Sequence, residues 1–342
     1  MGGTMRMAFL LVIPAVVAAG SGCNRTETPP AATAPTTVTT MTEAPFIAEV
    51  EKSGGKIKRS GNAPDGPVVE VDFAYGGLRR TTDIDTLVGH FKELNQLQTL
   101  DLHNSEVGDV GLENLKGLKT LQSLNVDGTK VTDAGLESLR DLIHLRLLRL
   151  SETKVTDAGL THFNSLHELK LLDLSGTKVS DVGLEYLKGL DHLEELHLTR
   201  TDVTDAGLVY LKGMNKLQFL GLGGTKVTDV GLEHIEGFAE LLHLTLERTM
   251  VSDLGLEHLK VLKQLETLVL SDTKVTDAGL QHLKGLTQFQ FLMLKNTKVT
   301  DASVEYLQGL SQLRYLDLRG TDVTAEGVKK LQNVLPKCKI ER

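Results

Sequence analysis

The sequence predicts an α/β solenoid, a stack of similar coils that each contribute a short strand and a short helix. The first observation is a valine that recurs every 24 residues without an insertion, at Val107, Val131, Val155, Val179, Val203, Val227, Val251, Val275, Val299 and Val323. Repetition at a fixed period of this length is the signature of a repeat architecture. The second observation is composition: leucine dominates and aromatic residues make up 4% of the chain, so we expect an aliphatic core.

The third observation is that each unit has two halves with different spacings. In "LQSLNVDGTKV", the spacing of Leu124, Val126 and Thr129 suits a short strand followed by a turn. In "TDAGLESLRDL", leucines recur at threes, which is typical of a short helix with one buried stripe. A degenerate copy precedes the ten units, with the same phases at Asp85, Val88, Phe91, Leu94, Leu97, Leu100 and Leu102.

This unit resembles the leucine-rich repeat family, whose strand signature is LxxLxLxxN/C. Here the last position of the signature is a serine or threonine, at Ser105, Thr129, Thr153, Thr177, Thr201, Thr225, Thr249, Thr273, Thr297 and Thr321. The "TDxGLxxL" half is similar to the cysteine-containing subclass, found in F-box-associated proteins and in many bacterial proteins. The resemblance covers about residues 83–342. It implies a right-handed solenoid, or horseshoe, with a parallel sheet on the concave face and short helices on the convex face.

Stacking would place each repeat position in a column that runs along the solenoid. An aspartate column runs from Asp109 to Asp301 and ends at Ala325. Calcium needs six to eight converging oxygens, which one carboxylate per coil does not supply. We expect instead that the Thr/Ser–Asp pair begins each helix: one of the two caps free amides, and the charge faces the positive helix end. The sequence does not decide which of the two is the N-cap.

Three further columns are expected to be structural. We expect the threonine hydroxyls of the "TKV" position to satisfy turn amides, and the glycine column from Gly111 to Gly279 to allow close backbone packing. The successive histidines His234, His258 and His282 would point the same way from neighbouring helices, which does not form a tetrahedral metal shell. The sequence therefore predicts no metal and no cofactor.

Recognition is expected on the concave sheet, where two strand positions vary from coil to coil. One position runs through Thr99, Ser123, Leu147, Leu171, Glu195, Phe219, His243, Thr267, Phe291 and Tyr315. The other runs through Asp101, Asn125, Arg149, Asp173, His197, Gly221, Thr245, Val269, Met293 and Asp317. Exposed aromatic side chains and methionine suit a protein or peptide anchor. The candidate partner-binding residues are His197, Phe219, His243, Phe291, Met293 and Tyr315; the alternative is that they cover the sheet without a ligand.

The amino terminus predicts export. Arg6 precedes the apolar run "MAFLLVIPAVVAA", and small residues lead into Cys23, so residues 1–22 are interpreted as a signal peptide. The "GSGC" stretch resembles the lipobox of bacterial lipoproteins, although Gly20 stands where that family usually has leucine. The resemblance implies lipidation of Cys23 and a lipid anchor at the cell envelope; plain secretion is the alternative.

The remaining chain divides by composition. Residues 23–45 form a Thr/Pro-rich segment that predicts a disordered tether, residues 46–82 an N-terminal cap, and residues 83–342 the solenoid, with a C-terminal cap at about residues 328–342. We expect the lone Cys338 to be half-buried in that last cap.

The net charge and the motifs of the chain limit the classes of function that we expect. A formal charge of −8 disfavours nucleic acid as a partner. The chain shows no nucleophile–base pair or phosphate loop, and His197 and His243 lie two repeats apart in different columns. We therefore expect a non-enzymatic protein-interaction module at the cell envelope. The alternatives are an intracellular ubiquitin-ligase-type substrate adaptor, which the repeat subclass resembles, and a purely structural envelope protein.

Overall fold

The computed structural model describes residues 43–62, 66–73 and 87–342. Chain contacts separate Met1–Thr37 from Val38–Arg342, and every described element belongs to the second unit. The predicted signal peptide, Cys23 and most of the predicted tether lie outside the described residues. Among the described residues, no helix combines the length and the apolar character needed to cross a membrane.

One sheet of thirteen strands runs through the unit in chain order, so each strand pairs with the next one along the chain. The first pair is antiparallel and all later pairs are parallel. The strands are β1 (Lys56–Arg59), β2 (Val68–Asp72), β3 (Thr99–Asp101), β4 (Ser123–Asn125), β5 (Leu147–Arg149), β6 (Leu171–Asp173), β7 (Glu195–His197), β8 (Phe219–Gly221), β9 (His243–Thr245), β10 (Thr267–Val269), β11 (Phe291–Met293), β12 (Tyr315–Asp317) and β13 (Lys339–Glu341). The leucine-rich repeat solenoid predicted from the sequence is confirmed.

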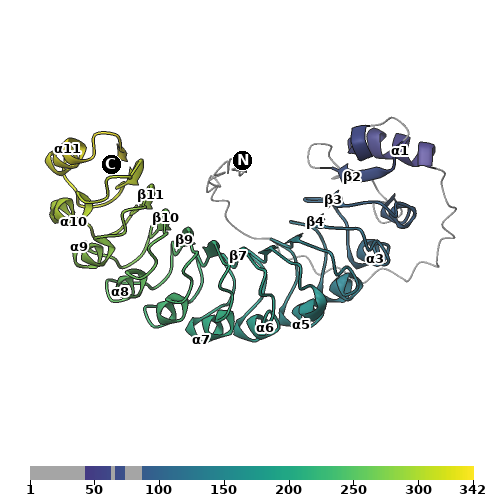
Figure 1. Ribbon diagram of the computed structural model, residues 1–342, viewed down its shortest axis with the longest axis horizontal. Coiled ribbons are helices and arrows are strands. Elements are labelled where there is room, and N and C mark those ends of the chain that lie inside the picture. Colours follow the sequence, from purple (N-terminus) through teal and green to yellow (C-terminus); the bar gives the residue numbers. More distant parts are fainter. Residues whose placement is uncertain (1–42, 63–65, 74–86) are drawn as a thin grey trace, which may run out of the picture. The chain divides into compact units, whose positions relative to one another are not determined.

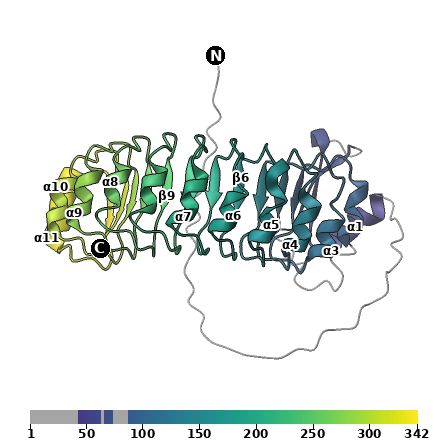
Figure 2. The same cartoon turned by 90° about the horizontal axis from the view of Figure 1, so that it is seen from below.

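Short helices lie on the side of the unit opposite the sheet, and successive coils set them side by side (Figures 1 and 2). The α-helices are α1 (Glu43–Lys52), α3 (Asp109–Glu113), α4 (Asp133–Leu136), α5 (Asp157–Leu160), α6 (Asp181–Glu185), α7 (Asp205–Leu208), α8 (Leu256–Leu259), α9 (Asp277–Leu280), α10 (Val304–Leu307) and α11 (Ala325–Val334). The 3₁₀ turns are Ser60–Asn62, Phe91–Glu93, Glu137–Leu139, Phe163–Ser165, Val209–Leu211, Gly231–Ile235, Gln281–Leu283 and Asp301–Ser303.

The spacing of leucines at threes explains why these helices are short. In the second repeat, α4 ends at Leu136 and a 3₁₀ turn carries on from Glu137 to Leu139. A 3₁₀ helix has three residues per turn, so side chains three apart face the same way. Leu136, Leu139 and Leu142 are accordingly all fully buried.

The core is a continuous aliphatic column between sheet and helices. The repeat valines are at most 1% exposed, and the central leucine of each strand from β3 to β12 is at most 1% exposed as well. Four phenylalanines, Phe91, Phe163, Phe238 and Phe289, occupy leucine positions of the repeat and are also buried. Register explains the continuity: Leu100 pairs with Leu124, which pairs with Leu148, and so on along the sheet.

Both ends of the core are closed by elements outside the regular repeat. At the amino-terminal end, α1 places Phe46 edge-on to Phe91, with ring centroids 5.4 Å apart. At the carboxyl end, α11 is ten residues long, and β13 pairs Ile340 with Leu316. Cys338 is 3% exposed, so the expectation that it would be half-buried is wrong. Its neighbours in this cap, Leu331 and Leu335, are buried too.

Candidate functional site

The structure resolves how the "TD" pair works. Thr132 is the N-cap of α4, and its Oγ1 accepts a hydrogen bond from the amide of Ala134 at 3.3 Å. Asp133 is the first helical residue, and its carboxylate reaches the next coil: Oδ1 accepts from the Thr156 amide and Oδ2 from the Thr156 hydroxyl, both at 2.7 Å. The threonine therefore caps its helix, while the aspartate lies in the first turn and joins two coils.

This pairing repeats at every junction from Asp109–Thr132 to Asp301–Thr324, with serine replacing threonine at Ser180 and Ser252. We call this row of bonds the Asp–Thr ladder. It ends where the last repeat carries Ala325 in place of aspartate. The aspartate column is thus accounted for by architecture.

The threonine and glycine columns support the same junctions. Thr129 Oγ1 donates to the Val126 carbonyl at 2.7 Å, and the column threonines from Thr153 to Thr321 make the same bond in their coils. The expected bond from a turn amide is found at Ser105 and Thr321, which accept from the Val107 and Val323 amides at 3.4 and 3.5 Å. Gly183 confirms the predicted close packing, because a Cβ there would lie 2.4 Å from Asp157 Oδ1. Glycine leaves room for the ladder carboxylate.

The histidine column does not gather into a metal site. His258 Nδ1 lies 2.7 Å from Glu236 Oε1, and His282 Nε2 lies 3.4 Å from the Gln281 amide. Over residues 43–62, 66–73 and 87–342, no group of three or more histidine, cysteine or acidic side chains could hold a metal ion. The helical side therefore shows packing and surface contacts.

The inner face of the sheet, meaning the two variable positions of each strand and the residue two positions after the strand, holds a ring cluster built from three of the predicted residues. The rings of His197 and Phe219 are stacked, with centroids 4.2 Å apart and an interplanar angle of 23°. The ring of His243 is tilted against Phe219 at 6.2 Å. These residues come from β7, β8 and β9. We call them the ring cluster.

Local sequence explains the position of these rings. Gly221 has no side chain, so the Phe219 ring can lean over it; a Cβ at Gly221 would lie 3.2 Å from Phe219 Cε1. His243 Nδ1 lies 3.0 Å from Thr267 Oγ1, and burial lowers the pKa of the His243 ring. All three rings of the cluster are half-buried, so they present edges and part of their faces rather than fully exposed anchors.

The other three predicted residues form a separate group on β11 and β12. Phe291 pairs in register with Tyr315, and Met293 pairs with Asp317. Met293 is 9% exposed, so the expectation that its side chain is exposed is wrong. Burial and a hydrogen bond to Glu341 raise the pKa of Tyr315 to about 12, which keeps the phenol protonated at neutral pH.

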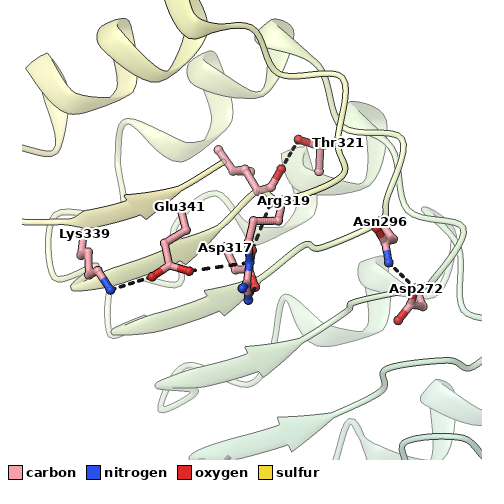
Figure 3. Close-up of polar contacts among 8 residues, drawn as sticks. Asp272, Asn296, Asp317, Arg319, Thr321, Lys339 and Glu341 are labelled. Carbon is pink, nitrogen blue, oxygen red and sulfur yellow. Dashed lines mark hydrogen bonds and ion pairs between the residues drawn. The ribbon is translucent and has the colours of Figure 1, made fainter. Parts of the chain in front are cut away.

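Charges at the carboxyl end of the inner face are paired with one another (Figure 3). Arg319 donates to both carboxylate oxygens of Asp317, at 2.9 and 2.6 Å, and its Nε lies 3.6 Å from Glu341. Lys339 Nζ lies 2.6 Å from Glu341 and also sits 5.5 Å from the centroid of the Tyr315 ring. A neighbouring turn holds Asn296 against Asp272 at 2.7 Å. This end of the face is electrostatically balanced.

The amino-terminal part of the inner face differs, and the sequence interpretation missed it. Asp101 accepts from Asn125 Nδ2 at 3.1 Å and lies 2.7 Å from His103 Nδ1. Asp127, just beyond β4, accepts from the Ser151 amide at 2.6 Å. Burial, reinforced by the charges of Asp173 and Asp101, raises the pKa of Asp127 to about 6.

We call Asp101, Asp127 and Asp173 the acidic patch. Two basic side chains lie beside the patch: Arg149 Nη1 is 3.7 Å from Asp173 Oδ2, and His103 Nδ1 is 2.7 Å from Asp101 Oδ1. The available sequence signal was the recurrence of acidic residues at strand ends in neighbouring repeats. Asp127 follows its strand and looked like an ordinary turn residue.

Comparisons with known proteins agree with this architecture. The family description "Leucine rich repeat" matches residues 143–203, and a second description of the same name matches residues 117–139 and 310–331. A sequence comparison with curated proteins gives no match. The fold is shared with an internalin from Listeria monocytogenes, at 22% identity and a TM-score of 0.50, covering 74% of this chain and 82% of the internalin.

Two other solved structures extend the comparison. The ectodomain of the Arabidopsis receptor kinase HAESA, solved with a peptide hormone ligand, has 15% identity and a TM-score of 0.58, with 85% of this chain and 51% of that chain covered. A leucine-rich repeat protein of Leptospira interrogans has 18% identity and a TM-score of 0.44 over 79% of this chain and 95% of that one. The repeat matches, the strand register and the fold shared with the internalin and the HAESA ectodomain support a leucine-rich repeat fold for the stack of 24-residue units.

Proposed function

We propose that this chain is a non-enzymatic interaction module that binds a protein or peptide on the inner face of its sheet. The observation that carries the proposal is the contrast between columns. The ladder, glycine and valine columns are nearly constant, whereas the two inner-face positions change from coil to coil. A constant scaffold with one varied face suits recognition, because solenoids offer an extended surface whose side chains are not needed for the core.

The ring cluster supports the same proposal. Half-buried aromatic side chains lose little conformational freedom when a partner covers them, so they are effective anchors at interfaces. His197, Phe219 and His243 form one such anchor point, and Phe291 with Tyr315 forms another. The HAESA ectodomain, which has the same fold, was solved with a bound peptide hormone, and this favours a peptide or an extended protein segment as the partner.

The test is a triple variant, Phe219→Ala, Phe291→Ala and Tyr315→Ala. Purified wild-type and variant chains are used to capture partners from envelope extracts, with capture quantified by mass spectrometry. A matched control replaces three exposed apolar residues of the helical side, Val182, Val230 and Leu254, with alanine. We expect the triple variant to capture at least tenfold less partner than wild type, and the control variant to capture as much as wild type. If both variants capture equal amounts of the partner, the inner face is not the binding site.

We also propose that the protein is exported and anchored to the cell envelope through a lipid on Cys23, with secretion as the alternative. The support is the amino-terminal sequence "MAFLLVIPAVVAAGSGC". The test is incorporation of radiolabelled palmitate by wild type, by Cys23→Ala and by the control Cys338→Ala. Label is expected in wild type and in the control. A protein that stays unlabelled in the cytosol would favour the intracellular adaptor instead.

A further inference from the structure

The inner face carries its charge unevenly. Along β3 to β7, four acidic residues, Asp101, Asp127, Asp173 and Glu195, share the surface with Arg149. The rings of His103 and His197 lie beside Asp101 and Glu195. From β11 to β13, the cations Arg319 and Lys339 are held by Asp317 and Glu341. The amino-terminal half of the face is therefore negative and the carboxyl-terminal half is balanced.

The negative charge of the acidic patch is poorly compensated. The next cations along the sheet, Arg146 and Lys170, are paired with glutamates: Arg146 Nε lies 3.1 Å from Glu168, and Lys170 Nζ lies 2.6 Å from Glu194. Arg149 lies 3.7 Å from Asp173, beyond hydrogen-bond distance. Burial is the main cause of the raised pKa of Asp127, and repulsion from Asp173 and Asp101 adds to it, while the Ser151 amide and Arg149 act in the opposite direction.

The acidic patch adjoins the ring cluster. Asp173 on β6 pairs in register with His197 on β7, and the His197 ring stacks on Phe219 of β8. From β3, which carries Asp101, to β8 the sheet advances by five strand spacings, about 24 Å, which an extended peptide of about seven or eight residues spans. One short segment can therefore contact both features.

We propose that the partner presents a segment rich in lysine or arginine, which lies across Asp101 and Asp127, beside the largely buried Asp173, while a neighbouring apolar side chain packs on the Phe219 ring. This inference rests on the proposed function and names the chemistry of the partner. The segment supplies the positive charge that the face lacks, and the half-buried rings accept its apolar part. Complementary charge of this kind speeds encounter and fixes the orientation of the bound segment.

The test uses three fluorescent synthetic peptides and the mature chain. Each peptide has four charged or polar residues followed by two phenylalanines, separated by glycines; the four residues are lysine, serine or glutamate. At about 50 mM salt we expect the lysine peptide to bind at least tenfold more tightly than the serine peptide, and the glutamate peptide to bind weakest. Raising salt to about 0.5 M should remove most of the difference.

Two matched variants locate the effect. Asp127→Asn with Asp173→Asn removes two inner-face charges, and Glu137→Gln with Glu233→Gln removes two exposed charges from the helical side. The inner-face variant should lose the preference for lysine, whereas the helical-side variant should keep it. Circular dichroism confirms that both variants are folded. Equal binding of the lysine and serine peptides by wild type, or equal losses in the two variants, would overturn the proposal.

Failure of this inference is distinguishable from failure of the proposed function. If wild type captures a natural partner through the aromatic residues and the inner-face charge variant captures it equally, the basic segment is wrong and the binding face stands. If Phe219→Ala leaves the binding of all three peptides and of the natural partner unchanged, both fail. A salt-sensitive dimer that the charge variant abolishes would make a second copy the occupant and overturn the proposal.

Discussion

At the scale of single residues, Asp127 is the most unusual group on the inner face. Its carboxylate accepts from the Ser151 amide, a contact that lowers its pKa, yet burial and the charges of Asp173 and Asp101 outweigh that contact. The pKa of Asp127 rises from 3.8 to about 6. The folded state therefore holds this proton more tightly than the unfolded chain does, and ionisation of Asp127 costs stability.

The direction of the pKa shift determines how the stability of the protein changes with pH. The contribution of Asp127 to stability is present below about pH 4 and is lost as pH rises through 6, because the folded pKa lies above the unfolded value. Asp127→Asn keeps an acceptor for the Ser151 amide and removes the charge. At pH 7.5 we expect the variant to be more stable than wild type by roughly 1–2 kcal/mol, with the difference vanishing near pH 4. Urea denaturation at both pH values measures this, and a variant less stable at pH 7.5 would contradict it.

At the scale of the element, the Asp–Thr ladder explains how four-residue helices persist. A helix this short is unstable alone. Its first amides are capped by the threonine of the same coil, and that threonine is fixed by the aspartate of the preceding coil. The helix starts at Thr132, Thr156, Thr204 and Thr276 are thus fixed twice, once along the chain and once across the stack.

The ladder gives a matched pair of substitutions. Asp205→Ala removes two acceptors, which bond the Thr228 amide and hydroxyl at 2.7 Å each, and leaves that amide without its acceptor. We expect a loss of about 2–3 kcal/mol in the free energy of unfolding. The control, Asp202→Ala, breaks an exposed ion pair with Lys226 and should change that free energy by less than about 1 kcal/mol. Equal effects of the two substitutions would rule out the ladder as a stabilising feature.

At the scale of the described unit, the fold is a one-dimensional stack whose interior must be closed at both ends. The amino-terminal end is covered by α1 and the β1–β2 hairpin, and the carboxyl end by α11 and β13. The strand β13 pairs the open edge of β12, and an unpaired edge of this kind invites association between chains.

Removal of residues 325–342 tests the cap. We expect the shortened chain to aggregate or to unfold at a lower temperature, because Leu316 and Leu318 lose their cover and β12 becomes an edge. Size-exclusion chromatography and thermal denaturation measure both effects. Val334→Ser, at an exposed position of α11, serves as the control and should leave both measurements near wild type. If the shortened chain stays monomeric and its thermal unfolding midpoint is unchanged, residues 325–342 are not needed as a cap.

The sequence predicted the coils because an uninterrupted period of 24 determines which residues are neighbours on the sheet, and the register confirms it at Leu100, Leu124 and Leu148. It did not decide the N-cap, since both threonine and aspartate can accept an amide hydrogen bond. It also misjudged Met293, whose burial depends on neighbouring side chains. Asp127 was missed because its environment is assembled from several coils, and that proximity is absent from any one repeat.

Because the Asp–Thr ladder is uniform, it affects how the number of repeats in this protein can change during evolution. Each coil carries an acceptor for the following coil and a donor for the preceding one. Excision or duplication of any whole 24-residue unit would therefore bring together two coils that already match. Recombination between identical copies of "TKVTDAGL" could shorten or lengthen the sheet and rearrange the variable side chains without damaging a junction. A change of specificity would then need no compensating change in the scaffold.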